Sequence, residues 1–248
     1  MSSIRNVLLA SLPRKVYQEV QSGFSEVTLE FGEMLYEHDQ PMLQVYFPVT
    51  CLVSLMVVVD QDMALEVAVV GREGMVGVAL ALGARFSPVR AIVQGEGLAL
   101  RMNRARFLAS LRSHLPLQRA LDSYTHGLMA QIAQTAACNR FHLLNARLAR
   151  WLLMTRDRLA SGEFRVTQQF LAAMLGVRRV GVSEAASSFQ QQNLIRYSRG
   201  VITILDHAGL EAACCSCYGL DAVRAGAMAN WRPAAGAMED SSSLKKSS

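Results

Sequence analysis

The sequence has almost no lysine and no hydrophobic run long enough to cross a membrane. Only Lys15, Lys245 and Lys246 are lysines, so arginine supplies nearly all of the positive charge. The longest apolar run, residues 75–84, is interrupted by glycine and falls far short of the ~18 residues that a membrane span needs. The apolar stretch at residues 6–10 is short and is soon followed by basic residues, which argues against a secretory signal. We therefore expect no membrane contact.

Cysteine is scarce and lacks the pattern of an extracellular protein. Five cysteines, an odd number without framework spacing, favour a reducing compartment, so we expect a cytoplasmic protein. No cysteine precedes Cys51, which excludes an iron–sulfur cluster on an N-terminal cysteine group. Cys214, Cys215 and Cys217 could ligate a metal together with His207, but their spacing fits no recognised zinc site. We therefore predict no metal and favour reduced thiols there.

Histidine is too sparse for a metal-dependent β-barrel enzyme. A cupin-like metalloenzyme needs two or three histidines and a carboxylate that converge inside the barrel. In the β-rich segment 25–102, His38 is the only histidine, so an enzyme is a remote alternative and we expect no catalytic role. His38, His114, His126 and His142 leave haem ligation open, although no pattern marks any of them.

The positive charge is concentrated in one segment. The chain has 248 residues, of which 51% are hydrophobic and 18% charged, as is typical of a folded globular protein. The formal net charge is +5, yet residues 140–205 carry ten arginines and three acids, whereas residues 1–139 and 206–248 each have a net charge of −1. A positive excess confined to one segment is typical of a unit that binds nucleic acid phosphates.

Within that basic segment, residues 167–205 predict two short helices followed by a β-hairpin. Thr167 is a good N-cap, and Gly176 suits the sharp turn before a second helix at 178–191. Two β-prone runs around a turn with glycine, residues 194–205, predict a hairpin. The second helix is expected to bury Val182, Ala185, Ala186 and Phe189. This order is a winged helix-turn-helix, whose second helix can enter a DNA major groove. The alternative, a helical hairpin in an enzyme core, does not explain the charge.

The rest of the chain predicts a β domain joined to this unit by a long helix. Residues 4–21 look helical with a break near Pro13, and residues 25–102 contain many short strands bounded by turn residues, which suggests a jelly roll. The fold class is therefore α+β. The helix at 116–139 has a near-heptad apolar stripe that favours a dimer seam over a buried core helix. The stripe comprises Leu117, Leu121, Tyr124, Leu128, Ile132 and Thr135.

The order of jelly roll, long helix and winged helix, with LARWLLMTRDR before the motif and LGVRR at its turn, resembles the Crp/Fnr family of bacterial transcription regulators. The resemblance covers about residues 5–218. It implies a β-roll sensor domain similar to cyclic-nucleotide-binding domains at 1–115, a dimerisation helix at 116–139 and a winged helix-turn-helix at 140–218. It also implies a homodimer that binds a roughly palindromic promoter site in double-stranded DNA, where RNA polymerase is a candidate partner. We expect the tail, 219–248, to be disordered.

The resemblance assigns DNA-reading roles only in part. Arg179 stands where the family has its first recognition arginine, whereas Val180 replaces the usual acid and Glu184 replaces a second arginine. Our candidates for reading bases are Arg178, Arg179, Ser183 and Glu184. Our candidates for phosphate contacts are Thr167, Gln168, Arg196, Tyr197 and Arg199. A solvated hairpin edge remains the alternative for Arg196 and Arg199.

The sensor half contains the elements of an anion site without the full nucleotide pattern. The sub-pattern GREGMVG…SPVRAIVQ resembles family members whose effector is often undefined. The effector-binding candidates are Glu73, Gly74, Arg85, Ser87 and Arg90. Phe86 stands where nucleotide-binding members have a small residue beside the arginine, which disfavours cyclic AMP. We therefore predict a regulator with no required cofactor and an unknown effector. The alternative is a ligand-independent repressor whose β-roll only dimerises or contacts a protein partner.

Overall fold

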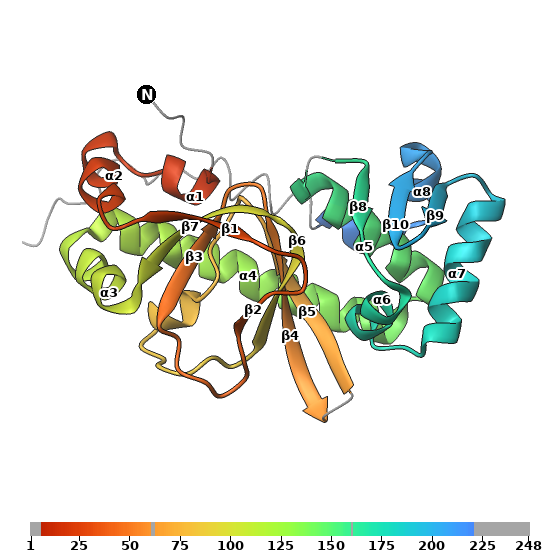
Figure 1. The fold of residues 1–248 in the computed structure, drawn as a ribbon, viewed down its shortest axis with the longest axis horizontal. Coiled ribbons are helices and arrows are strands. Elements are labelled where there is room, and N and C mark those ends of the chain that lie inside the picture. Colours follow the sequence, from red (N-terminus) through yellow and green to blue (C-terminus); the bar gives the residue numbers. More distant parts are fainter. Residues whose placement is uncertain (1–5, 61–62, 160, 221–248) are drawn as a thin grey trace, which may run out of the picture.

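The computed structural model describes residues 6–60, 63–159 and 161–220. A β domain and a helix-rich domain lie at opposite ends of the long axis, and helix α4 (Leu115–Phe141) runs along the β domain towards the other (Figure 1). This is the predicted α+β arrangement of jelly roll, long helix and winged helix. No helix among the described residues is long and apolar enough to span a membrane.

The β domain consists of two antiparallel sheets packed face to face. One has the strand order β1-β7-β3 and the other β2-β6-β4-β5. The buried residues between them, including Phe47, Val53 and Val93, form one continuous core. The strands that the structure describes here are β1 (Ser25–Leu29), β2 (Met34–Tyr36), β3 (Gln44–Pro48), β4 (Leu52–Asp60), β5 (Met63–Val70), β6 (Arg90–Gly95) and β7 (Gly97–Asn103). They confirm the jelly roll that the short, turn-bounded runs predicted.

Short helices precede and follow the strands of this domain in the sequence. Helices α1 (Val7–Ala10) and α2 (Arg14–Gln21) are separated near Pro13, as predicted. The side chain of Asn6 caps α1 and donates hydrogen bonds from Nδ2 to the carbonyl oxygens of Pro48 and Gly74. Asn103 caps α3 (Arg104–Ser113) by accepting a bond from the Arg106 amide. A 3-10 helix, η1 (Val78–Leu80), lies between β5 and β6.

Helix α4 packs on its own protomer through most of the stripe that predicted a dimer seam. Leu117, Leu121, Tyr124 and Leu128 are buried in the β-domain core. The Tyr124 hydroxyl donates to the Met75 carbonyl at 2.9 Å. These four residues are therefore committed to intramolecular packing, and for them the structure agrees with the alternative of a core helix. Of the remaining two, Ile132 is 36% exposed, and Thr135 accepts a hydrogen bond from Arg150.

The C-terminal domain is a winged helix-turn-helix with its own core. Helix α5 (Leu144–Leu159) packs behind α6 and α7, and the sheet has the order β8-β10-β9. Val182, Ala185, Ala186 and Phe189 are all buried, as the helical spacing predicted. The other elements are β8 (Glu163–Arg165), α6 (Gln168–Leu175), α7 (Arg179–Gln191), β9 (Ile195–Ser198), β10 (Val201–Ile204) and α8 (His207–Ala213). Strand β8 and helix α8 were not predicted, and the predicted disordered tail lies outside the described residues from 221 onward.

Candidate nucleic-acid interface

The helix-turn-helix is defined by a cap and a left-handed turn. The Thr167 hydroxyl accepts a hydrogen bond from the Phe170 amide at 3.0 Å, which satisfies one of the free amides at the start of α6. Gly176 ends α6 with φ +62°, a conformation that only glycine adopts without strain. Arg178 is the N-cap residue of α7. Arg178 and Arg179, at the start of α7, are both exposed.

Gln168 connects the two helices at the predicted DNA-reading surface. Its Oε1 accepts a hydrogen bond from Ser183 Oγ at 2.8 Å and one from Arg179 Nε at 3.3 Å. Ser183 also donates to the Arg179 carbonyl at 3.1 Å. Gln168 thus orients two base-reading candidates.

The wing is held against the helices by a tyrosine. The Tyr197 hydroxyl donates to the Val166 carbonyl at 2.8 Å, and its amide donates to Gln190 Oε1 at 2.8 Å. Burial raises the pKa of Tyr197, while the Arg179 charge opposes that shift. The wing turn follows at Arg199 and Gly200, which both have positive φ. Tyr197 therefore positions the wing and keeps the exposed Arg199 at its tip.

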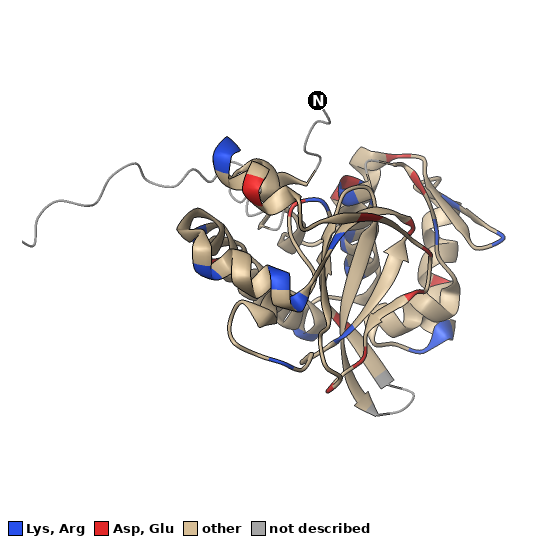
Figure 2. Ribbon diagram, turned by 60° about the vertical axis from the view of Figure 1, so that its left-hand side comes forward, with Lys and Arg blue, Asp and Glu red and all other residues tan. Residues whose placement is uncertain are grey.

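Five of the predicted DNA contacts line one concave surface. This pocket of about 670 Å³ is bounded by the α6 N-terminus, the start of α7 and the wing. The predicted residues that line it are Thr167, Gln168, Arg179, Tyr197 and Arg199. Arg178, Ser183, Glu184 and Arg196 do not line it, although Ser183 contacts it through Gln168. Figure 2 shows that the winged-helix domain carries several Lys or Arg positions in this part of the molecule.

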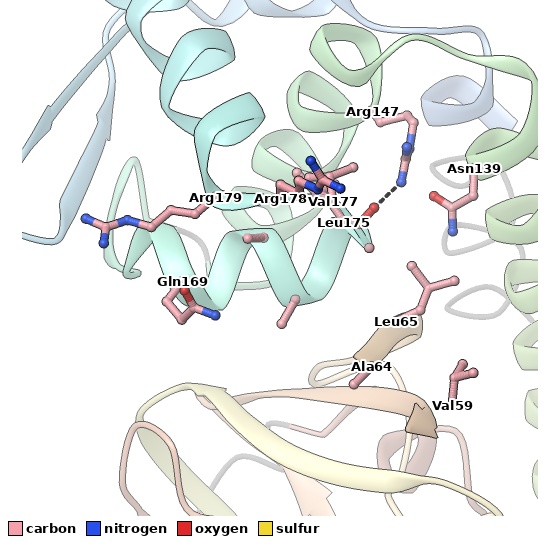
Figure 3. Close-up of a pocket in the computed structure, with 13 residues that line it drawn as sticks. Val59, Ala64, Leu65, Asn139, Arg147, Gln169, Leu175, Val177, Arg178 and Arg179 are labelled. Atoms are coloured by element: carbon pink, nitrogen blue, oxygen red, sulfur yellow. Dashed lines mark hydrogen bonds between the residues drawn. The ribbon is translucent and has the colours of Figure 1, made fainter. Parts of the chain in front are cut away.

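A second pocket lies between the β domain and the helix-turn-helix (Figure 3). It has a volume of about 850 Å³, and the β4–β5 hairpin contributes Val59, Ala64 and Leu65 to its wall. Arg147 donates to the Leu175 carbonyl at the end of α6. A Cβ placed on Gly176 would lie 2.7 Å from the Leu65 side chain. The hairpin therefore touches the turn that precedes the recognition helix.

Polar contacts beneath this hairpin join the two domains. Arg158 on α5 pairs with Glu73 at 2.9 Å, and both side chains are at least 85% buried. Gln94 donates to the Thr155 hydroxyl at 2.8 Å. Glu66 on β5 is buried against α5, and desolvation raises its pKa to about 7. The β domain and α5 are thus joined by groups that are costly to separate from their partners.

The effector-binding candidates are engaged in contacts within the protein. Glu73 pairs with Arg158, and Arg90 pairs with Glu37 through three contacts of 2.9–3.1 Å. The Ser87 hydroxyl donates to the Val89 carbonyl at 2.6 Å. Gly74 packs against the Tyr124 ring, where an added Cβ would lie 2.1 Å from a ring carbon, and Arg85 is exposed. Among the described residues, no hydrogen bond or ion pair joins any two of the five candidates, so their role in effector binding stays a prediction.

Two cysteines near the end of the winged-helix domain lie beside a different histidine from His207, which the sequence offered as a possible partner. Cys215 and Cys217 meet Cys138 and His142, from the end of α4. His207 instead lies 3.6 Å from Glu211 on its own helix. Sequence spacing missed this group because its two pairs, one at the end of α4 and one after α8, lie more than seventy residues apart.

Comparisons with known proteins agree with this fold. Residues 146–213 match the Crp-like helix-turn-helix domain. The structure of FixK2 from Bradyrhizobium japonicum superposes with a TM-score of 0.66 at 18% identity, covering 78% of this chain and 98% of that one. A CRP-family transcriptional regulator from Thermus thermophilus gives 0.64 at 18%, covering 75% and 95%. The c-di-GMP responsive global regulator CLP of Xanthomonas campestris gives 0.64 at 15%, covering 78% and 100%. A search of curated protein sequences gave no match.

The matched domain and the fold together define the class of protein. A Crp-like helix-turn-helix following a jelly roll and a long helix is the architecture of a DNA-binding transcription regulator. Residues 146–213 carry the Crp-like helix-turn-helix domain, and the chain as a whole shares the fold of Crp/Fnr regulators.

Proposed function

We propose that this protein acts in the cytoplasm as a homodimer that binds a roughly palindromic DNA site and has no catalytic role. The recognition helix, α7 with its N-cap Arg178, enters the major groove in each half-site. The observation that carries this proposal is the concave surface at which the α6 N-terminus, Arg179 and the wing meet. Such a surface follows one DNA backbone while the adjacent helix reads base edges.

The base-reading role falls to the exposed start of α7. Arg178 and Arg179 are long cations at a helix N-terminus, where a guanidinium can bond guanine O6 and N7 together. Glu184, exposed on the same helix, can accept a bond from cytosine N4. Ser183 and Gln168 fix the Arg179 side chain, which reduces the entropy that it loses on binding.

Phosphate contacts come from the α6 N-terminus and the wing. The first-turn amides behind Thr167 point out of the helix, and such amides bind anions well. Arg199 at the wing tip and Arg196 on β9 are exposed and can reach a second stretch of backbone. These contacts position the domain without specifying sequence.

A second copy of the chain would pair through the outer face of α4. Its exposed positions recur at spacings of four, three, four and three residues, as in a coiled-coil seam, and Met129 is 64% exposed. These positions are Asp122, His126, Met129, Ala133 and Ala136. We propose this face in place of the predicted apolar stripe of α4, because most residues of that stripe are buried in the protein's own core. Small alanines would allow the two helices to approach closely.

An effector bound in the β-roll would control DNA binding in one version of this function, and a ligand-independent repressor is the alternative. The contacts of the effector-binding candidates favour the alternative. The candidates Glu73, Ser87 and Arg90 already have intramolecular partners. A ligand-independent repressor needs no further site, whereas an effector would have to displace these contacts. RNA polymerase remains a candidate partner only if the protein activates transcription.

The test is fluorescence anisotropy without added effector. The labelled probe is the promoter region upstream of the protein's own gene, and binding is measured over a series of salt concentrations and against unlabelled scrambled DNA as competitor. Arg179→Ala is compared with Arg112→Ala, an exposed arginine on α3 that is remote from the interface. We expect selective binding by the wild type and by Arg112→Ala, and loss of selectivity in Arg179→Ala. Equal behaviour of the two variants would contradict the assigned interface.

A further inference from the structure

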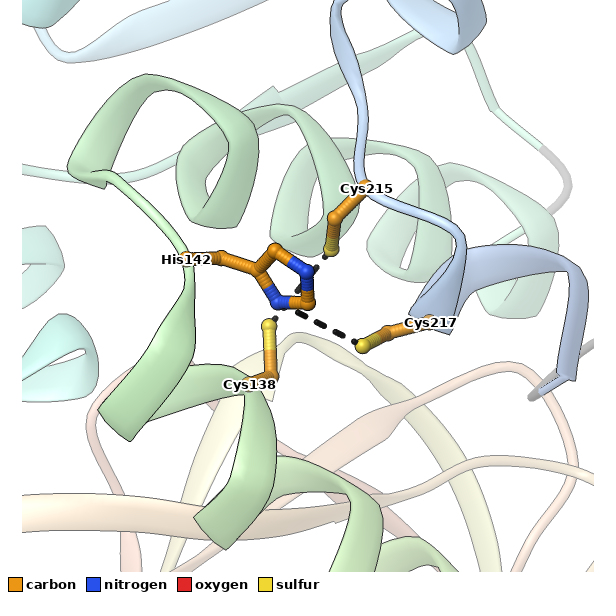
Figure 4. Close-up of side chains that lie close together, drawn as sticks. All are labelled: Cys138, His142, Cys215 and Cys217. Atoms are coloured by element: carbon orange, nitrogen blue, oxygen red, sulfur yellow. Dashed lines mark hydrogen bonds between the residues drawn. The ribbon is translucent and has the colours of Figure 1, made fainter.

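Four potential metal ligands from two distant parts of the chain meet where α4 ends (Figure 4). Cys138 lies in the last turn of α4, and His142 is the C-cap residue of the same helix. Cys215 and Cys217 follow α8, at the end of the winged-helix domain. The four side chains point towards a common centre in Figure 4.

The distances within this group match the edges of a coordination tetrahedron. Cys138 Sγ lies 3.6 Å from Cys215 Sγ, and Cys217 Sγ lies 3.6 Å from His142 Nδ1. All four ligand atoms lie within 4.8 Å of one another. Tetrahedral zinc, with Zn–S of about 2.3 Å and Zn–N of about 2.0 Å, separates two sulfurs by roughly 3.8 Å and sulfur from nitrogen by roughly 3.5 Å. Small side-chain movements would therefore complete the site.

The local backbone holds these ligands in place. The His142 amide donates to the Cys138 carbonyl at 3.1 Å, which sets the two α4 ligands one helical turn apart. The Tyr218 amide donates to the Cys215 carbonyl at 3.1 Å and closes a turn around Cys217. Cys138 and Cys217 are buried, while Cys215 and His142 are partly exposed.

A polar side chain supports the group from outside. Gln134, one turn before Cys138, donates from Nε2 to Cys217 Sγ at 3.0 Å. Hydrogen bonds from an amide to a ligating sulfur orient the ligand and stabilise its thiolate form. The group thus has ligands, a polar supporting donor and partial access from solvent.

We propose that Cys138, His142, Cys215 and Cys217 bind a single zinc ion, which fastens the end of α4 to the segment after α8. Three thiolates and one imidazole are a common donor set of structural zinc sites. Binding releases the three thiol protons to solvent and involves no oxidation or reduction. The zinc braces the joint between α4 and α5, about which the winged-helix domain would turn.

Two other uses of these thiols are less consistent with the geometry. A Cys138–Cys215 disulfide would have to close the 3.6 Å separation to about 2.05 Å and would leave Cys217 and His142 without a role. A two-iron cluster spreads its ligands over two metal atoms and needs wider spacing than this compact group offers.

The test is metal analysis of the full-length protein, purified under reducing conditions, by inductively coupled plasma mass spectrometry. We expect one zinc per chain in the wild type. Metal-free protein titrated with Co²⁺ should develop thiolate-to-metal charge transfer and the visible bands of tetrahedral cobalt, saturating at one equivalent. This titration uses the wild type alone, so it stays informative if a variant fails to fold.

Cysteine variants separate the proposed ligands from neighbouring thiols. Cys138→Ser and Cys217→Ser should lose the zinc, whereas the matched controls Cys214→Ser and Cys51→Ser should retain it. Zinc should raise the melting temperature of metal-free wild type but not of Cys138→Ser. The proposal is overturned by absence of zinc together with no cobalt spectrum, by equal metal loss in Cys214→Ser, by an iron–sulfur absorption spectrum, or by a Cys138–Cys215 disulfide in the mass of the reduced preparation. None of these outcomes depends on DNA binding.

Discussion

The Glu66 carboxyl should make the free energy of unfolding fall as the pH rises from about 5 to 8, and replacing Glu66 by glutamine should remove this contribution. Glu66 is 8% exposed on β5, against α5 of the winged-helix domain. Burial raises its pKa from 4.5 to about 7, and the nearby Ser54 hydroxyl, the Trp151 indole and the charges of Arg150 and Arg158 only partly oppose this shift. Among the described residues, Oε2 of this carboxyl has no hydrogen-bond partner.

The size of the effect follows from the difference between the two pKa values. Because the folded pKa is the higher one, folding favours the protonated carboxyl. Its stabilisation is complete below about pH 4.5 and is lost as the pH rises through 7. The full difference corresponds to about 3 kcal/mol, and most of it falls between about pH 5 and pH 8. Glutamine cannot ionise. The free energy of unfolding of Glu66→Gln should therefore rise relative to that of the wild type by most of this amount between about pH 5 and pH 8.

The assay is urea denaturation followed by circular dichroism at several pH values, comparing wild type, Glu66→Gln and Glu26→Gln. Glu26 is an exposed acid on β1 and serves as the control. Taking the difference between variant and wild type cancels the other titrating groups. A difference that stays constant from pH 5 to pH 8, or an equal trend in Glu26→Gln, would refute a buried, neutral Glu66.

Four further substitutions test the interface, the dimer and the turn. Arg179→Ala should weaken binding to the specific site roughly 5- to 150-fold with little effect on binding to scrambled DNA. Arg199→Ala should weaken binding to both DNAs alike and lower the slope of log binding constant against log salt concentration by about one. The opposite pattern in anisotropy titrations would reverse the two roles. Met129→Glu should convert dimer to monomer in sedimentation velocity, while the equally exposed Leu82→Glu should not, and a dimeric Met129→Glu would exclude the outer face of α4. Gly176→Ala should lower the free energy of unfolding by at least about 1 kcal/mol, because Gly176 has a positive φ and an added Cβ would meet Leu65. The control Gly162→Ala, where the added Cβ would enter open space, should be nearly neutral in thermal unfolding. Equal stability of the two variants would argue against the left-handed turn.

Local patterns in the sequence were sufficient for the helix-turn-helix and the wing hairpin. Thr167 and Gly176 mark the ends of α6 through their own chemistry, a hydroxyl that caps and a backbone that tolerates positive φ. The apolar spacing in α7 placed Phe189 in the core. Strand β8 was missed because it has only three residues and is stabilised by pairing with β10, which local propensity does not register.

The α4 stripe illustrates the limit of periodicity. Spacing identified Leu121 and Tyr124 as one apolar face, but an apolar face can be covered by a second protomer or by the protein's own β domain. The structure covers it with the β domain, and the Tyr124 hydroxyl reaches a carbonyl there. The partners of two effector-binding candidates could not be predicted for a related reason, since Arg158 and Glu37 lie far from Glu73 and Arg90 in the sequence.

The sequence by itself determined the order of domains, the caps and turn of the helix-turn-helix, and the positive charge of its DNA-binding segment, because each depends on neighbouring residues or on composition. Only the tertiary structure decided which face of α4 stays exposed, how the β4–β5 hairpin meets the turn before the recognition helix, and that Cys138 and His142 join Cys215 and Cys217. Those outcomes depend on packing between segments that are distant in the chain, where the energy lies in contacts that no local pattern encodes.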